Sequence, residues 1–288
     1  MQNEELNNLD YNAPLIRDLA EFKPEPEVIT PNNPPWNGWI ASGVWFLSVL
    51  AIIVFPIFFI VPYVLMNMNK EVSLESFATD STAIFLNLIA IVPAHIFTLA
   101  VAWFVATKNN NFSLKDTLGL SSGGFRWWYY PAILIAFFAV AGIVSYFIPE
   151  GDNDLLKILR SSRMAVFAVV ILATFTAPLV EEVVYRGILY SAFQRRVGVA
   201  WAVVIVTFMF AAVHVPQYWG SPGTILLICL LSLVLTLIRV KTDNLLPCII
   251  MHTIFNGIQS LVLIVEPYLP KVESTVQEQT AFIHRFFT

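Results

Sequence analysis

The chain has 288 residues, of which 57% are hydrophobic and only 12% are charged, and its mean hydropathy is +0.71. Soluble domains carry about 25% charged residues, so this composition excludes an ordinary water-soluble domain and indicates a protein whose apolar surface faces membrane lipid. The formal net charge of −4 and the lack of a basic stripe exclude a nucleic-acid-binding surface.

The two ends of the chain are predicted to be polar tails. Residues 1–38 are acidic and rich in Pro and Asn, and they lack the basic segment and apolar core of a signal peptide. Residues 266–288 are polar with an amphipathic end, and they contain no Cys-a-a-X sequence for prenylation. The expected organisation is one transmembrane domain, residues 39–265, between two tails.

Between the tails, apolar stretches alternate with polar loops, and most of the stretches approach the roughly 20 residues that cross a bilayer as a helix. The predicted fold class is all-α: a polytopic bundle of transmembrane helices with about seven spans, or eight helices if a short amphipathic stretch at 155–163 is counted. The expected spans cover residues 39–66, 82–106, 131–147, 164–196, 200–215, 224–240 and 246–265.

Lys and Arg residues in the short loops predict the orientation, because cytoplasmic loops carry an excess of both. With the N-terminus inside, the cytoplasmic loops hold seven basic residues and the opposite loops hold four. We therefore expect a cytoplasmic N-terminus. The seven residues are Lys108, Lys115, Arg126, Arg195, Arg196, Arg239 and Lys241.

The fourth expected span contains ionisable residues that a membrane helix rarely carries, since each costs about 2.5–3.5 kcal/mol at the bilayer centre. The segment EEVVYRG holds Glu181, Glu182 and Arg186. Glu182 and Arg186 are four residues apart and can pair on one helix face. Glu181 lies about 100° round the helix and can point into a cavity. A purely structural ion pair is the alternative, although it needs only one carboxylate.

Polar residues in two later spans complete the pattern. His214 ends the fifth span, while His252 and Asn256 lie four residues apart on one face of the seventh. If the fourth and fifth spans form a hairpin that turns near Gly198, Glu181 and His214 both lie about 25 Å from the turn. The two residues are therefore expected at a similar depth.

Three segments resemble the motifs of the CAAX protease and bacteriocin-processing family, which includes the type II CAAX prenyl endopeptidases. They are EEVVYRG (181–187), FAAVH (210–214) and HTIFN (252–256), which fit the family patterns EExxxR, FxxxH and HxxxN in the same order. The resemblance covers about residues 164–263. It implies a glutamic intramembrane endopeptidase with its active site in a membrane-embedded cavity. It also implies a multi-pass protein of the inner or plasma membrane, and the short loops favour a bacterial one.

The resemblance also implies roles for the motif residues. Glu181 would activate a water molecule with the help of His214, while His252 and Asn256 would stabilise the oxyanion. The second Glu and the Arg of the first motif would be a supporting pair. The implied substrate is a membrane-associated or prenylated, CAAX-type, protein or peptide, and no cofactor is implied.

Other chemistries and other classes of function stay open. Two His residues and a Glu are a known zinc set, but the chain has no HExxH sequence and no CxxC pair, so zinc is the less favoured reading. Ser232 and Ser260 lack a nucleophile motif.

A non-catalytic membrane immunity or scaffold protein of the same fold is the main alternative. A transporter with Glu181 as carrier is a third, but we find no paired repeats. Neither the substrate nor the oligomeric state follows from the sequence.

Overall fold

The computed structural model describes residues 28–67, 76–77, 79–148, 151, 153–265 and 268. Within these residues the regular secondary structure is helical, apart from an isolated bridge between Thr30 and Asn33. The predicted all-α class is therefore confirmed. Most of both expected tails lies outside the described residues.

The helical segments follow one another along the chain. Two stretches of π-helix, η3 and η4, interrupt the long helix that carries the first motif. The elements are α2 (Gly38–Asn67), α3 (Ser81–Ile89), α4 (Ile91–Thr107), α5 (Leu114–Leu118), α6 (Tyr129–Phe147), α7 (Asp154–Ser161), α8 (Arg163–Ile171), η3 (Leu172–Thr176), α9 (Ala177–Glu182), η4 (Val183–Leu189), α10 (Tyr190–Val197), α11 (Val199–His214), α12 (Pro222–Thr242) and α13 (Leu246–Val265).

Within the residues that the structure describes, six helical stretches are long and apolar enough to cross a membrane: α2, α3 with α4, α6, α8 through α10, α12 and α13. They confirm six of the seven expected spans and give the chain the build of a multi-pass membrane protein. The remaining one, α11, is apolar but has 16 residues. At 1.5 Å per residue it is about 24 Å long, which is shorter than the hydrocarbon core of about 30 Å.

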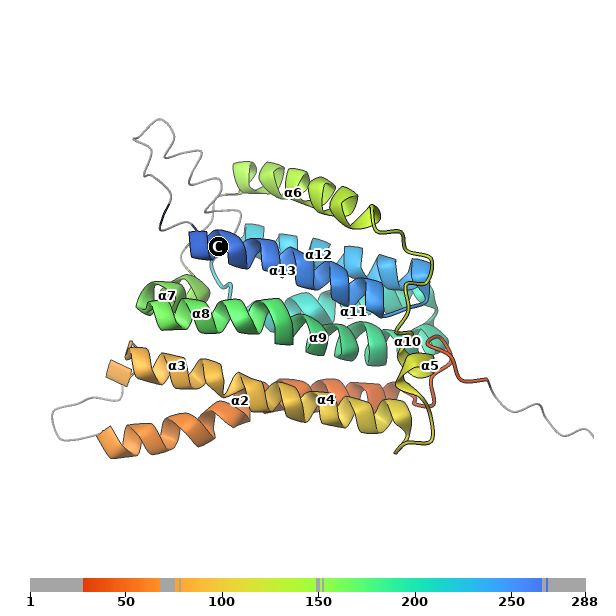
Figure 1. The fold of residues 1–288 in the computed structure, drawn as a ribbon, viewed down its shortest axis with the longest axis horizontal. Helices are drawn as coiled ribbons and strands as arrows, with labels where there is room; N and C mark the ends of the chain where they lie inside the picture. The colour runs from red at the N-terminus through yellow and green to blue at the C-terminus, as the bar shows by residue number, and fades with distance from the viewer. Residues whose placement is uncertain are drawn as a thin grey trace, which may run out of the picture.

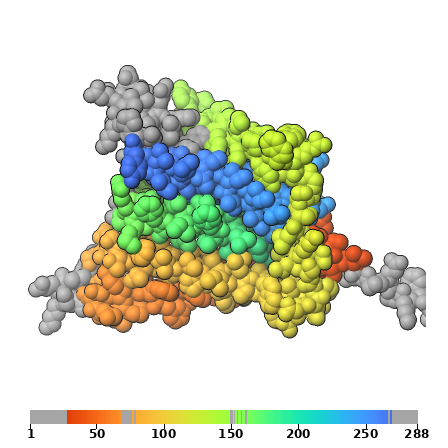
Figure 2. Space-filling view, in the orientation of Figure 1, coloured from red at the N-terminus to blue at the C-terminus, as the bar shows by residue number. Residues whose placement is uncertain are grey.

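The long helices run along a common direction in layers (Figure 1). Helices α2 to α4 form one side, α7 to α11 the middle, and α12 and α13 the other side, with α6 along the outer margin. Figure 2 shows the same order in space-filling form, with α3 and α4 in orange and yellow below α8 to α10 in green. Large apolar side chains such as Phe58, Ile135 and Phe208 are exposed on the outside, as expected where the solvent is lipid.

The expected hairpin between the fourth and fifth spans is present. Gly198 separates α10 from α11 and has a φ of 82°, a left-handed value that a glycine adopts without strain. The sharp reversal lets α11 pack back against α10. It also brings the second motif, at the end of α11, towards the first.

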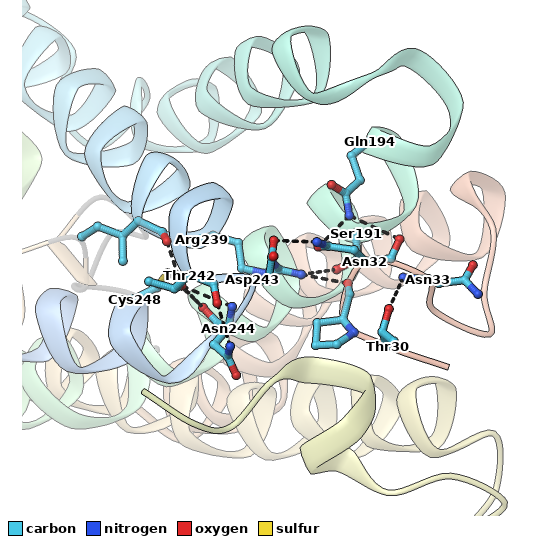
Figure 3. Close-up of polar contacts among 12 residues, drawn as sticks. Thr30, Asn32, Asn33, Ser191, Gln194, Arg239, Thr242, Asp243, Asn244 and Cys248 are labelled. Carbon is cyan, nitrogen blue, oxygen red and sulfur yellow. Dashed lines mark hydrogen bonds and ion pairs between the residues drawn. The ribbon is translucent and has the colours of Figure 1, made fainter. Parts of the chain in front are cut away.

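One end of the bundle is tied together by the residues that precede α2, which we call the N-terminal strap (residues 30–37). The Asn32 side chain donates to Asp243 Oδ1 at 2.6 Å and accepts from Gln194 Nε2 at 2.8 Å (Figure 3). The buried Trp36 indole donates to the Ile188 carbonyl at 3.0 Å. The strap therefore joins the end of the first-motif helix to the turn between α12 and α13.

Candidate active site

The first motif lies where the α-helix changes to a π-helix. Glu181 and Glu182 are the last residues of α9, and Arg186 lies inside η4. A π turn inserts an extra residue into the helical repeat and is frequent at functional sites. Here it changes the angular spacing of the residues that follow Glu182, while Glu182 and Arg186 still meet.

Glu182 and Arg186 form a fully buried ion pair, with Arg186 Nη1 2.8 Å from Glu182 Oε1 and neither side chain exposed. The rest of the guanidinium binds α12. Arg186 Nε donates to Thr236 Oγ1 at 3.2 Å, and Nη2 donates to the Ser232 hydroxyl at 2.7 Å and carbonyl at 2.9 Å. Such complete pairing offsets the cost of burying a charge.

Glu182 has a second partner that the sequence did not indicate. His252 Nδ1 lies 2.8 Å from Glu182 Oε1, and because a carboxylate oxygen accepts, the ring donates from Nδ1. This bond fixes the orientation of the imidazole and leaves Nε2 facing Glu181. Glu182 therefore joins Arg186 of the first motif to His252 of the third.

Glu181 lies between the two motif histidines. Its Oε1 is 4.0 Å from His214 Nε2 and its Oε2 is 3.8 Å from His252 Nε2. His214 Nδ1 is 2.7 Å from the Phe210 carbonyl, so it donates there and Nε2 is left without a hydrogen in the neutral ring. Distances of 3.8–4.0 Å are too long for direct hydrogen bonds, but a water molecule can bridge them.

The two adjacent carboxylates have different surroundings. The Glu181 side chain is 23% exposed, whereas that of Glu182 is fully buried and pairs with a cation. Phe210 packs beside both histidines, with ring centroids 4.7 Å from His214 and 6.1 Å from His252, and the Arg186 guanidinium lies 4.7 Å from its centroid. The FxxxH motif therefore contributes an aromatic wall as well as a histidine.

Asn256 is placed apart from this arrangement. Its Nδ2 donates to the Ala173 carbonyl at 2.8 Å, in the π-helix η3. One of its two amide hydrogens therefore holds α13 against the first-motif helix. Of the sequence-predicted residues, the structure brings Glu181, Glu182, Arg186, His214 and His252 into one cluster, and Asn256 lies on the same face of α13 with a different partner.

Two residues of this cluster were missed as ligands of Arg186: Ser232 and Thr236. They are four residues apart in the otherwise apolar α12, so they share one helix face. A fully buried Arg186 needs acceptors for all of its N–H groups. Two hydroxyl side chains spaced four residues apart on a neighbouring helix are the sequence feature that could have identified these acceptors. In the part of the chain that the structure describes, no group of three His, Cys, Asp or Glu side chains is placed to hold a metal ion.

The fold and the buried Glu–His–Arg cluster define a polytopic α-helical membrane protein with a polar centre between its helices. Residues 163–258 match the family model described as Type II CAAX prenyl endopeptidase Rce1-like. This stretch runs from α8 into α13 and includes all seven motif residues, so residues 163–258 are a domain of the Rce1-like type II CAAX prenyl endopeptidase family. Neither the curated proteins nor the solved structures gave a match to the chain. The match suggests an intramembrane protease that acts on a peptide or protein substrate.

Proposed function

We propose that the protein is an intramembrane endopeptidase in which Glu181 activates a water molecule for attack on a peptide bond. The observation that carries this proposal is the position of Glu181 between two histidine Nε2 atoms, at 3.8 and 4.0 Å. Its neighbour Glu182 pairs with Arg186, whereas no Lys or Arg among the described residues pairs with Glu181. A partly exposed carboxylate, at a distance from two histidines that a water molecule can bridge, is suited to general-base catalysis.

The proposed reaction begins with a water molecule held by Glu181 and His214. Glu181 takes one proton while the water oxygen bonds to the carbonyl carbon, and the carbonyl electron pair moves to its oxygen to form a tetrahedral oxyanion. The intermediate collapses, the C–N bond breaks, and the proton on Glu181 passes to the leaving amine. Water and peptide give a carboxylic acid and an amine, which ionise to a carboxylate and an ammonium, and no acyl-enzyme forms.

The oxyanion requires hydrogen-bond donors. Because Nδ1–H of His252 is committed to Glu182, the ring donates from Nε2 only when it is protonated. We assign that role to protonated His252, with Glu182 as the group that orients it. Asn256 has a second amide hydrogen besides the one that binds the Ala173 carbonyl, and we assign it the role of a supporting donor.

The proposed substrate is a membrane-associated or prenylated, CAAX-type, protein or peptide, bound in a membrane-embedded cavity. The description of the matching family supports this class, as does a catalytic cluster carried by membrane-spanning helices. The alternative is a non-catalytic membrane immunity or scaffold protein of the same fold. That reading gives no reason for a partly exposed Glu181 between two oriented histidines.

The test is cleavage by the purified protein of a quenched fluorescent peptide panel that includes a prenylated CAAX peptide. Glu181→Gln keeps the shape of the side chain but removes the base, so we expect cleavage to fall about 10²–10⁴-fold. Asp116→Asn, the same change at an exposed position on α5, is the matched control and should retain full activity.

Each assay is run with and without a strong chelator. Cleavage that survives Glu181→Gln unchanged contradicts the proposed base. Loss on chelation with recovery on adding zinc moves the mechanism to a metalloprotease. A wild type that cleaves neither the panel nor any protein in N-terminal profiling of whole membranes supports the non-catalytic alternative.

A further inference from the structure

A groove of about 400 Å³ lies between α6 and α12, on a part of the protein that the proposed reaction does not use. Ala136 and Val140 of α6 line one wall, and Val234 and Leu237 of α12 line the other. The lining is apolar except for one charged side chain, Lys241.

Helix α6 packs against both α12 and α13 beside the groove. Phe137 and Phe138 of α6 pack on Phe255 of α13, with ring centroids 4.9 Å and 5.5 Å away. The small side chain of Ala136 leaves the space between α6 and α12 unfilled at this point. Figure 1 shows α6 along the outer margin of the bundle. Val140 is 43% exposed, so an apolar wall of the groove is open to the surroundings.

The groove has one polar end, at the level of the membrane interface. Lys241 lies in the last turn of α12. At the start of α6, which is the same end of the bundle, Trp127 is 80% exposed and Trp128 is 44% exposed. Exposed Trp side chains mark the headgroup level. The Lys241 stem can follow the apolar wall while its ammonium reaches the headgroups.

The Lys241 charge is available to a ligand. Among the described residues Lys241 is exposed and has no hydrogen bond or ion pair. The nearest acidic residue in the chain, Asp243, accepts from Asn32 and lies 3.9 Å from Arg239 Nη1, on the strap side (Figure 3). The loops at this end hold seven basic residues and, within the described residues, two acidic ones, Asp116 and Asp243. The local charge therefore favours an anion.

We propose that this groove binds an anionic phospholipid, with one acyl chain between α6 and α12 and the phosphate at Lys241. A basic site between transmembrane helices at the cytoplasmic surface suits an anionic headgroup. An apolar cleft of this volume suits a hydrocarbon chain. The opposite face of α12 holds Arg186 through Ser232 and Thr236, so the bound lipid packs against the helix that supports the first motif. The proposal does not depend on the proposed function.

The test uses phosphatidylglycerol with a photoactivatable diazirine in its acyl chain, in phosphatidylcholine vesicles that contain the full-length protein. Labelled peptides are mapped by mass spectrometry. We expect phosphatidylglycerol to label residues 133–140 and 230–238 about fivefold more than phosphatidylcholine with the same acyl chain, the preference that one interfacial Lys provides.

Variants separate the charge from the groove. Lys241→Gln should reduce phosphatidylglycerol labelling to the phosphatidylcholine level, and Lys241→Arg should restore it. Lys115→Gln makes the same change at an exposed position of the same end, away from the groove, and should leave labelling unchanged. Ala136→Phe should reduce labelling by filling the groove while every charge is kept.

Three results would overturn the proposal. The first is equal labelling by the two lipids in the wild type, which indicates ordinary annular lipid. The second is labelling that is unaffected by Lys241→Gln, or that lies outside the groove. The third is stronger labelling of the groove by a diazirine-bearing isoprenoid than by phosphatidylglycerol, which assigns the groove to a prenyl chain.

Discussion

Glu181 and Glu182 are neighbours of one residue type, but their surroundings differ. Glu182 is fully buried and accepts from both Arg186 and His252 through one oxygen, while its Oε2 has no partner among the described residues. Glu181 is partly exposed and faces two ring nitrogens across a gap. The sequence predicted the pairing of Glu182 with Arg186, because spacing along a helix decides it. The contact between Glu182 and His252 joins residues 70 positions apart, so spacing could not predict it.

Arg186→Ala should destabilise the protein by about 3–5 kcal/mol, because it leaves the Glu182 carboxylate buried without its cation. The measurement is thermal or denaturant unfolding in detergent. Arg196→Ala, which removes an exposed Arg from the same helix whose guanidinium lies 5.9 Å from the Trp39 ring centroid, is the matched control and should change stability by less than about 1 kcal/mol.

A double substitution sharpens this prediction. Glu182→Gln combined with Arg186→Met removes both buried charges, so it should be less destabilising than Arg186→Ala alone. If Arg186→Ala unfolds at the same temperature as Arg196→Ala, the buried ion pair does not stabilise the fold.

At the scale of elements, the sequence predicted one continuous helix over residues 164–196, but this stretch contains two π turns. A π turn has the composition of an α-helix, so local pattern cannot reveal it. The consequence concerns Asn256, which the motif resemblance assigned to the oxyanion. In the structure it donates to the Ala173 carbonyl of η3. By contrast, the hairpin near Gly198 was predictable, because a glycine between two apolar runs is a strong local signal.

The start of α13, and so the position of His252, depends on a loop that docks against the turn after α12. The Gly119 carbonyl accepts from the Leu245 N–H at 2.7 Å. At Gly123, with a φ of 55°, an added Cβ would clash with the Thr242 carbonyl oxygen. The loop and the turn are therefore in backbone contact, which only a glycine allows at this point.

Gly123→Ala should destabilise the protein by clearly more than Gly124→Ala. Both residues have positive φ, which costs an alanine about 1–2 kcal/mol. Only Gly123 adds a backbone clash, since a Cβ at Gly124 meets nothing within 4 Å. Thermal unfolding of the two variants measures the difference. Equal losses would mean that the loop is not docked as the structure shows.

For the whole molecule, hydropathy predicted the helices well because lipid requires a long apolar run for each span. Hydropathy predicted residues 200–215 as a seventh span. It measures how apolar a segment is, but not whether the helix is long enough to cross the membrane. The 16 residues of α11 lead into a turn at the far end of the bundle, where Asn153 donates to Ser221 at 3.1 Å. The loops predicted to be cytoplasmic gather at the opposite end, as the contact between Gly119 and Leu245 shows.

This separation of the two ends makes the predicted orientation testable by cysteine labelling. Ser122 lies in the exposed loop at the basic end, and Gln217 lies in the exposed turn between α11 and α12. Because basic loops stay in the cytoplasm, an impermeant maleimide added to intact cells should label Gln217→Cys and not Ser122→Cys. Inverted vesicles should give the reverse. The parent protein provides the background, since Cys229 and Cys248 lie inside apolar helices. Labelling of Ser122→Cys from outside intact cells would reverse the orientation and place Lys241 at the outer leaflet.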